Sequence, residues 1–365
     1  MTDKLAALET VGSGSYATAD VHFLLRAVEV DTTDIEEKER LIQSGQKHYS
    51  DMISLERPPS EMHMALYTQA MERNSCRMSK DIQSLAQALH TLYAGEPLAL
   101  VSFVRAGLPP GVLLRRALEG MGQDTRHYGI SIVRDRGIDT VALDAVIEAH
   151  GAANIVFVDG WTGKGAIAGE LQTALSQDPR FPEKPRLVVL ADPCGRAWLA
   201  ASADDWVIPS GILGATVSGL VSRSIWPTDD GLHGCVVYDH LREHDMTRAF
   251  IDHIDAERVQ LGPVASATPW SESKKESLQI KASGVISMLA ERFDVTNVNR
   301  IKPGIAEATR AVLRRVPDRV LVRDRGDADV QLLQYLTDRA GVAVEEVGDD
   351  IAPYKAVTII KAVGQ

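Results

Sequence analysis

An apolar run followed by a glycine-rich turn, NIVFVDGWTGKGAI (154–167), carries residue types that bind phosphate in proteins. Glycines let several backbone N–H groups converge on one anion, and the N-terminus of a following helix adds a partial positive charge. Asp159, at the end of the run, is placed to bind ribose hydroxyls or a metal ion. The glycine spacing excludes a Walker A loop and a GxGxxG fingerprint, and the alternative is a turn without a ligand. The expected phosphate-binding residues are Thr162, Gly163, Lys164 and Gly165.

A second apolar run, in SFVRAGLPPGVLLRR (102–116), ends in the tight turn Arg105-Ala106-Gly107 before a helix. A guanidinium beside free backbone N–H groups suits pyrophosphate, which arginine binds bidentately. Arg105 is therefore a candidate catalytic residue, and Ala106 and Gly107 are candidate substrate-binding residues. The alternative is a structural turn with a solvated arginine.

Arg134 and Arg136 follow a third run, in YGISIVRDRGID (128–139). Their position after a strand makes them candidate substrate-binding residues at the rim of the same site. The alternative is a pair of solvated arginines.

Basic residues are concentrated near the C-terminus in an otherwise acidic chain. Residues 299–325 hold eight arginines and lysines against three acidic residues. On a helix, Arg310 and Arg314 would lie one turn apart on one face, which suits the phosphates of an RNA backbone. The alternative is a domain that only docks against the rest of the protein. The expected RNA-binding residues are Lys302, Arg310, Arg314 and Arg315.

Cys194 supports a competing hypothesis, a cysteine hydrolase. It follows the run RLVVLADP (186–193) and precedes a stretch of helical character, and a helix N-terminus would lower the pKa of its thiol. No fixed spacing connects it to a histidine, and a cysteine at a strand end also serves as a small packing residue. The candidate bases are His233, His240 and His244, and the candidate orienting residues are Asp192 and Asp239.

The elements that must position these residues alternate between short β-rich runs and helical stretches, which predicts a doubly wound α/β domain with a largely parallel sheet. In such sheets ligands bind beyond the carboxyl ends of the strands, where the candidate residues lie. The expected strands are 98–104, 127–134, 153–160, 186–193 and 205–211, and the expected helices are 111–121, 138–151, 165–178 and 196–203.

The pattern of β-rich and helical stretches divides the chain into three parts. Residues 1–95 form a mainly helical extension, in which a capping pattern at Ser60 opens a long helix. Residues 96–265 form the α/β domain. Residues 285–365 form a small α/β unit with helices over 305–316 and 329–341 and strands over 319–324, 342–347 and 357–363.

Composition restricts the class of protein further. The 365 residues carry a formal net charge of -11, so contact with a nucleic acid requires a local basic patch. Three widely spaced cysteines argue against a disulfide scaffold. No signal peptide and no apolar run of about 20 residues are present, so we expect a cytoplasmic protein without a membrane partner. Assembly into a homo-oligomer is compatible with the sequence.

The turn at Arg105 resembles the pyrophosphate loop of type I phosphoribosyltransferases, and VDGWTGKG (158–165) resembles their loop for phosphoribosyl pyrophosphate (PRPP). It departs from the family pattern in having one acidic residue, Asp159, and a shorter spacer before Thr162. Nearly the whole chain resembles the bacterial phosphoribosyltransferase–Pelota fusions of tellurium-resistance (Ter) stress operons, also labelled StiP cysteine proteases. The matching stretches include SYATADVHFLLR, SFVRAGLPPGVLLRRAL, YGISIVRDRGID, IPSGILGATVSGLVSR and KPGIAEATRAVLRRVP.

This resemblance implies a type I phosphoribosyltransferase-like sheet and a Pelota-like C-terminal domain that binds RNA. It implies transfer from PRPP, or action on a nucleotide that contains ribose 5-phosphate, with 128–139 as a mobile lid. Mg²⁺ would bridge the pyrophosphate and the ribose hydroxyls, with few direct protein ligands. Two alternatives stay open: the hydrolase that uses Cys194, and a non-catalytic nucleotide-sensing RNA-binding protein.

Overall fold

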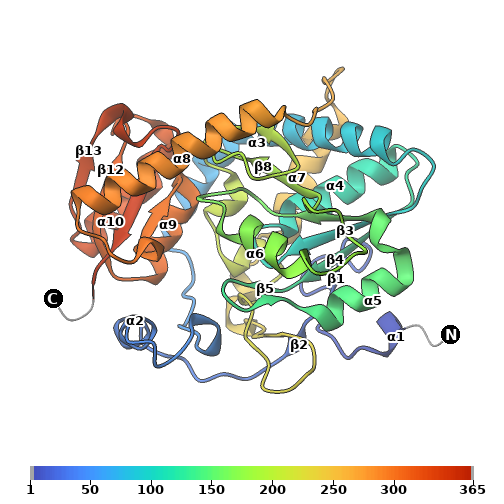
Figure 1. The fold of residues 1–365 in the computed structure, drawn as a ribbon, viewed down its shortest axis with the longest axis horizontal. Coiled ribbons are helices and arrows are strands. Elements are labelled where there is room, and N and C mark those ends of the chain that lie inside the picture. Colours follow the sequence, from blue (N-terminus) through green and yellow to red (C-terminus); the bar gives the residue numbers. More distant parts are fainter. Residues whose placement is uncertain (1–3, 363–365) are drawn as a thin grey trace.

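The apolar runs of the central region form most of one parallel sheet in the computed structural model, which describes residues 4–362 (Figure 1). The strand order is β1-β4-β3-β7-β8-β9, and each neighbouring pair is parallel. The strands are β1 (His22–Phe23), β3 (Leu98–Phe103), β4 (Thr125–Ile130), β7 (Ile155–Val158), β8 (Leu187–Ala191) and β9 (Leu199–Ser202).

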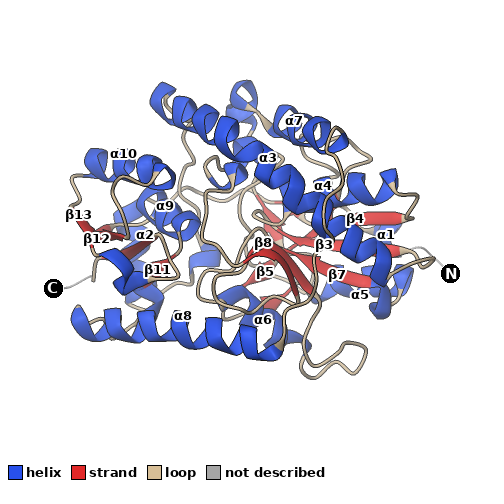
Figure 2. Cartoon of the chain, turned by 90° about the horizontal axis from the view of Figure 1, so that it is seen from above, coloured by secondary structure: helices blue, strands red, loops and turns tan. Residues whose placement is uncertain are grey.

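Helices cover both faces of this sheet, as Figure 2 shows from above. The alternating side chains of each strand therefore enter two different cores, and β3, β7 and β8 are buried along their whole length. Leu98 and Leu100 pack toward α3 and α4, whereas Ala99 and Val101 pack toward α5 and α6. The covering helices are α3 (Glu61–Leu92), α4 (Leu108–Gly120) and α7 (Thr247–Val259) on one face, and α5 (Thr140–His150) and α6 (Ala166–Leu175) on the other.

The predicted doubly wound α/β domain with a parallel sheet is confirmed, except at its last strand. The predicted helix over 196–203 is wrong, because this segment contains strand β9, where pairing with β8 outweighs the helical propensity of its alanines. The predicted strand over 205–211 is also wrong. Pro209 cannot donate to a sheet, and a 3₁₀ turn runs from Pro209 to Gly211 instead.

Residues 4–95 are helical only in part, and they are continuous with the sheet. β1 forms its edge, and the expected cap of α3 is confirmed, since the Ser60 side chain accepts a hydrogen bond from His63 N. Within residues 4–362 no helix, including the 32-residue α3, has the length and apolar character needed to cross a membrane. The other elements here are α1 (Lys4–Ala7), α2 (Ile35–Gln43) and β2 (Arg26–Ala27), which pairs with β10 (Gly234–Cys235).

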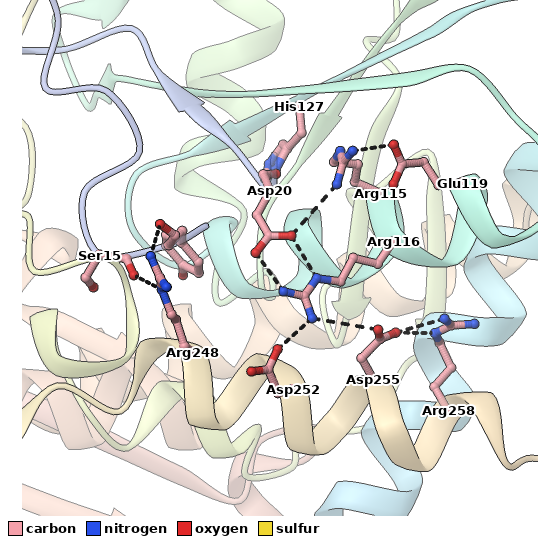
Figure 3. A network of polar contacts seen from close by, with 11 residues as sticks. Ser15, Asp20, Arg115, Arg116, Glu119, His127, Arg248, Asp252, Asp255 and Arg258 are labelled. Atoms are coloured by element: carbon pink, nitrogen blue, oxygen red, sulfur yellow. Dashed lines mark hydrogen bonds and ion pairs between the residues drawn. The ribbon is translucent and has the colours of Figure 1, made fainter. Parts of the chain in front are cut away.

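A buried ion network fastens the N-terminal segment to two helices (Figure 3). Arg116 of α4 donates two hydrogen bonds of 2.7 Å to the carboxylate of Asp20 and a third, of 2.8 Å, to Asp252 of α7. The side chain of Asp20 is 4% exposed, and Arg115 Nη1 also lies 3.8 Å from its carboxylate, so two arginines of α4 compensate this buried charge. This network ties the segment before β1 to α4 and α7.

The C-terminal part folds into a second, four-stranded sheet of order β11-β14-β12-β13. The long helix α8 (Glu272–Arg292) runs past both sheets and shares a core with the second one (Figure 2). The predicted small α/β unit is thus confirmed. Its elements are β11 (Ile301–Pro303), α9 (Ile305–Arg314), β12 (Pro317–Val322), α10 (Gln331–Ala340), β13 (Val344–Glu346) and β14 (Ala356–Ile360).

Candidate functional site

The candidate site lies where the strand order of the main sheet reverses. β3 precedes β4 and β7 in the chain but lies between them in the sheet, so the loops after β3 and β7 diverge to opposite faces. Such a switch point is where doubly wound sheets bind ligands. The two loops touch, because a Cβ on Gly107 would lie only 2.2 Å from the carbonyl oxygen of Val158. Glycine at this position permits the close approach.

The glycine-rich loop presents free backbone donors at the start of α6. Thr162 N donates to Ala191 O, which fixes the loop to the end of β8. Within residues 4–362, the N–H groups of Gly163, Lys164 and Gly165 donate to no protein acceptor. Gly165 has φ +83°, a left-handed conformation that turns the chain into the helix. Free N–H groups at a helix N-terminus form a site for an anion.

The Thr162 hydroxyl is not directed at this anion position in the ligand-free protein. It donates to a carboxylate oxygen of Asp192 in the loop after β8. Thr162 therefore orients the loop through both its backbone and its side chain.

Asp159 lies at the end of β7 on the wall of the same cavity. One carboxylate oxygen accepts from Gly160 N at 2.8 Å, and the residue is 9% exposed. Burial raises the pKa of Asp159 to about 7, although the nearby Arg310 guanidinium opposes this shift. A carboxyl group in this state can accept hydrogen bonds from ribose hydroxyls.

Arg105 and Ala106 both line the cavity, as expected from the sequence. The Arg105 guanidinium donates to Val221 O at 3.0 Å and to the Glu56 carboxylate at 2.9 Å. It is thus already held in place by protein groups. Gly107 is the N-cap of α4 and acts by letting the two loops pack.

The two arginines after β4 have different surroundings. They lie on the hairpin of β5 (Ile132–Val133) and β6 (Gly137–Ile138). Arg134 lines the cavity beside the Tyr49 ring, 5.3 Å from its centre. Arg136 instead pairs with Asp51, which anchors the hairpin to the N-terminal segment.

The C-terminal domain forms the opposite wall of the cavity. Lys164 Nζ donates to Val298 O at 2.7 Å, and the Tyr354 hydroxyl donates to Gly163 O at 3.0 Å. A Cβ on Gly163 would lie 2.4 Å from Oε1 of Glu307, so the Glu307 carboxylate lies directly against the glycine-rich loop. The two domains therefore build one site.

The residues expected to contact RNA also face this cavity. The Arg310 guanidinium lies over the Trp161 ring, 4.6 Å from its centre, and Arg315 pairs with Glu39 of α2. As RNA contacts they would have to act from inside the cavity, and not from the outer face of the domain. All four line it: Lys302, Arg310, Arg314 and Arg315.

The cavity, of about 340 Å³, is strongly cationic. Two acidic residues, Asp159 and Glu307, oppose nine basic ones. Burial lowers the pKa of Lys38 and of Lys302 to about 7 and that of Lys164 to about 8. An anion bound here would keep these lysines protonated, so the nine basic side chains suit an anion with several charges. The nine basic residues are Lys38, Arg105, Arg134, Lys164, Arg223, Lys302, Arg310, Arg314 and Arg315.

Four of these side chains form what we call the arginine cluster: Arg105, Arg223, Arg310 and Arg314. They also line a second cavity of about 820 Å³, so the cluster lies between two chambers. Glu56 Oε2 lies 2.9 Å from Arg105 Nη2 and 3.6 Å from Arg314 Nη2. Burial alone would raise the pKa of Glu56, but these two guanidinium groups hold it at about 2.

Cys194 lies beside the glycine-rich loop, and its hydrogen-bond partners within residues 4–362 are Thr162 and Asp192, not one of the histidines proposed as its base. Its Sγ is 3.2 Å from Thr162 Oγ1 and 3.7 Å from Asp192 Oδ1, and it packs in the core shared with α8. Burial and then the Asp192 carboxylate raise the pKa of the thiol. His233 bonds to Ser131 and His240 to Glu56 O, and His244 lies in a 3₁₀ turn after Tyr238.

Several residues that line the two cavities could not be identified from the sequence. Lys38, Glu56 and Arg223 lie in separate loops or helices whose polar residues resemble a solvated surface. Glu307 stood out only as an acidic exception in a basic segment, and Trp161 only as part of the glycine-rich turn. None of them belongs to a motif with a fixed spacing.

Comparison with known proteins identifies both parts of the chain. Residues 14–255 match the family model described as tellurite-like stress resistance cysteine protease StiP, and residues 281–362 match the PELOTA RNA binding domain. A relative from Acinetobacter baylyi, named cysteine protease StiP, is 52% identical over 366 residues, which cover 97% of this chain and 95% of the relative.

Solved structures show a more distant likeness. Hypoxanthine phosphoribosyltransferase from Trypanosoma cruzi with bound IMP is 16% identical, with a TM-score of 0.25, over 34% of this chain and 70% of that chain. A hypothetical protein from Neisseria gonorrhoeae with bound ppGpp is 19% identical, with a TM-score of 0.26, over 37% of this chain and 81% of that chain. The family models and the A. baylyi relative are far stronger matches, and through them the chain belongs to the StiP family of tellurite-like stress resistance proteins, with a PELOTA-type domain at its C-terminal end.

Proposed function

We propose that this protein is a phosphoribosyltransferase-like enzyme of a bacterial tellurium and stress-response pathway, acting on PRPP or on a nucleotide that contains ribose 5-phosphate. The observation that carries the proposal is the arrangement at the switch point. Free N–H groups, a carboxyl group and an arginine converge there on one cationic cavity of nucleotide size.

Each part of a phosphoribosyl donor has a complementary group. The N–H groups of Gly163, Lys164 and Gly165 would bind the 5′-phosphate, and Asp159 would accept hydrogen bonds from the ribose hydroxyls. The loop of Arg105 and its neighbours Ala106 and Gly107 would bind the pyrophosphate. Arg134 would approach the donor from the β5-β6 hairpin.

In the reaction, the bond between C1′ and the pyrophosphate oxygen breaks, and its electron pair leaves with pyrophosphate. The acceptor atom forms a new bond to C1′ and gives up one proton. The basic residues would stabilise the charge that develops on the leaving group, and the cavity walls would orient the two reactants.

Mg²⁺ is part of the same proposal. Within residues 4–362 no cluster of three or more histidine, cysteine or acidic side chains could hold a metal ion unaided. Asp159 and Glu307 nevertheless place carboxylate oxygens where a phosphorylated ligand would bind, and Mg²⁺ is commonly held by one or two carboxylates together with phosphates. Bound there, the ion would neutralise charge on the pyrophosphate.

Calorimetric titration tests this assignment. PRPP, ribose 5-phosphate and nucleoside monophosphates are titrated with and without Mg²⁺ into the wild-type protein and Asp159→Asn. The proposal predicts binding that requires the 5′-phosphate and weakens about 10-fold or more in the variant. Absence of binding by all of these ligands would overturn the site assignment.

The family name favours a second candidate, a cysteine protease. For that chemistry Cys194 would need a base and a lowered pKa, whereas its neighbours are a hydroxyl and a carboxylate and burial raises its pKa. Cys194→Ser separates the two candidates. A protease loses peptide hydrolysis in this variant, whereas a phosphoribosyl site keeps its ligand affinity.

A further inference from the structure

The second cavity, which we call the large chamber, has a wall suited to a planar ring. It is lined by the aromatic side chains of His63, Tyr238 and Tyr335, with apolar contributions from Pro58, Ile212 and Leu313. Aromatic and apolar side chains of this kind stack on nucleobases. At about 820 Å³, the chamber is larger than a lone base requires.

The arginine cluster at the junction of the two chambers is only partly satisfied, although Arg105 donates to Val221 O and Arg223 donates to the backbone oxygens of Tyr49 and Met52. Glu56 is the carboxylate that pairs with the cluster, and it contacts Arg105 and Arg314. Arg310 Nε and Arg223 Nη1 are buried and have no hydrogen-bond partner within residues 4–362. Because an unsatisfied buried donor is costly, these two atoms indicate a missing anion with several oxygens.

We infer that the ligand of this site is a ribonucleotide with two phosphate groups, which spans both chambers. This inference rests on the proposed function, because it begins with a ribose 5-phosphate on the glycine-rich loop. The second phosphate lies on Arg310 and Arg223, next to Arg314 of the same cluster, and a base lies in the large chamber. A free nucleoside bisphosphate and the terminal residues of an RNA strand both have this chemistry.

The inference assigns a new role to the PELOTA-type domain. Arg310 and Arg314 belong to α9, so the domain supplies the second-phosphate site of the cavity. If the domain had no part in binding, replacing its arginines would not change the ratio of the affinities for a nucleoside bisphosphate and a nucleoside monophosphate.

The test compares four probes by calorimetry: ribose 5-phosphate, adenosine 5′-monophosphate, adenosine 3′,5′-bisphosphate and a 5′-phosphorylated RNA trinucleotide. The expected result is that the bisphosphate or the trinucleotide binds about 10- to 100-fold more tightly than the monophosphate. A gain with the bisphosphate would identify the ligand as a free nucleotide. A gain with the trinucleotide would identify it as the end of an RNA strand.

Arg310→Gln and Arg314→Gln are expected to remove most of this gain, with a much smaller loss of affinity for ribose 5-phosphate itself. Arg323→Gln is the matched control, because Arg323 belongs to the same domain and pairs with Asp349 outside the cavity. The ligand-free Arg310→Gln protein should melt no lower than wild type, since it loses a buried charge without a carboxylate partner. A purely structural arginine would instead lower the melting temperature.

The outcomes separate the two proposals. If ribose 5-phosphate binds and Asp159→Asn weakens it, but a second phosphate adds nothing, the phosphoribosyl site stands and the inference is overturned. If the gain persists in both arginine variants, the second phosphate lies elsewhere and the inference is again overturned. If no probe binds, the proposed function is overturned, and the inference that rests on it is overturned as well.

Discussion

At the scale of single residues, the buried lysines make ligand binding sensitive to pH. Burial lowers the pKa of Lys38 and Lys302 to about 7, and it raises that of Asp159 to about 7. Between pH 7 and 9 the ligand-free lysines lose their protons, which weakens the attraction for a bound phosphate, whereas ionised Asp159 still accepts hydrogen bonds from the ribose hydroxyls. A bound phosphate conversely raises the pKa of each lysine, so binding takes up protons.

We therefore predict that the affinity for ribose 5-phosphate falls about 10-fold or more from pH 7 to pH 9. The phosphate itself stays doubly ionised over most of this range, since its second pKa is about 6. Calorimetry in two buffers with different ionisation enthalpies should show net proton uptake. A constant affinity without proton uptake would contradict the cationic-cavity assignment.

The three cysteines should differ in reactivity according to burial and pKa. Cys76 is exposed, whereas Cys194 and Cys235 are buried, and burial raises the pKa of both buried thiols. We predict that a thiol-specific reagent modifies one cysteine rapidly in the native protein and all three after denaturation. Mass spectrometry identifies the modified residue. Rapid modification of Cys194 would revive the protease hypothesis.

At the scale of elements, the contact between the two site loops depends on Gly107. A Cβ at Gly107 would lie 2.2 Å from the backbone oxygen of Val158, which no side-chain rotation can relieve. Gly107→Ala is predicted to lower the free energy of unfolding by about 1–3 kcal/mol and to weaken ligand binding.

Gly169→Ala is the matched control, since Gly169 lies in α6 and a Cβ there meets nothing within 4 Å. It should raise the free energy of unfolding by about 0.5–1 kcal/mol. Urea unfolding curves provide both values, and equal effects of the two substitutions would show that the contact is unimportant.

The same loops show how much of the structure could be predicted from the sequence. The strands that end at Phe103 and Val158, and the glycine-rich turn between β7 and α6, depend on local patterns, so they were found. β9 was taken for a helix because its leucine and alanines suit a helix as well as a strand, and only the neighbouring β8 decides between them.

The site could be predicted only where it is local. Asp159 and Ala106 stand next to recognisable turns and indeed line the cavity. Glu56 lies 49 residues from its partner Arg105 in the chain, and Glu56 and Arg223 reach the two cavities only through the tertiary fold. The basic helix α9 was recognised as a phosphate-binding surface, but its inward orientation depends on a domain contact that leaves no local pattern.

At the scale of the whole molecule, the orientation of α9 decides where RNA would bind. We predict that the affinity of the full chain for a single-stranded RNA decreases with salt, and that Arg310→Gln lowers the slope of log affinity against log salt by about 0.7. Arg323→Gln, on the outer side, should leave the slope unchanged. Filter binding at several salt concentrations measures both. The reverse pattern would place the RNA on the outer face of the domain.

The cavity has one wall in each domain, and this arrangement has a consequence for the evolution of the gene. A gene rearrangement that separated the two coding regions would leave one product with an open basic floor around Trp161 and Lys164. That product would also have an uncovered apolar surface at Cys194, where Ala282, Val285 and Tyr354 now pack. We therefore expect selection to keep the two parts within a single reading frame, and substitutions on facing walls to have been acquired in pairs.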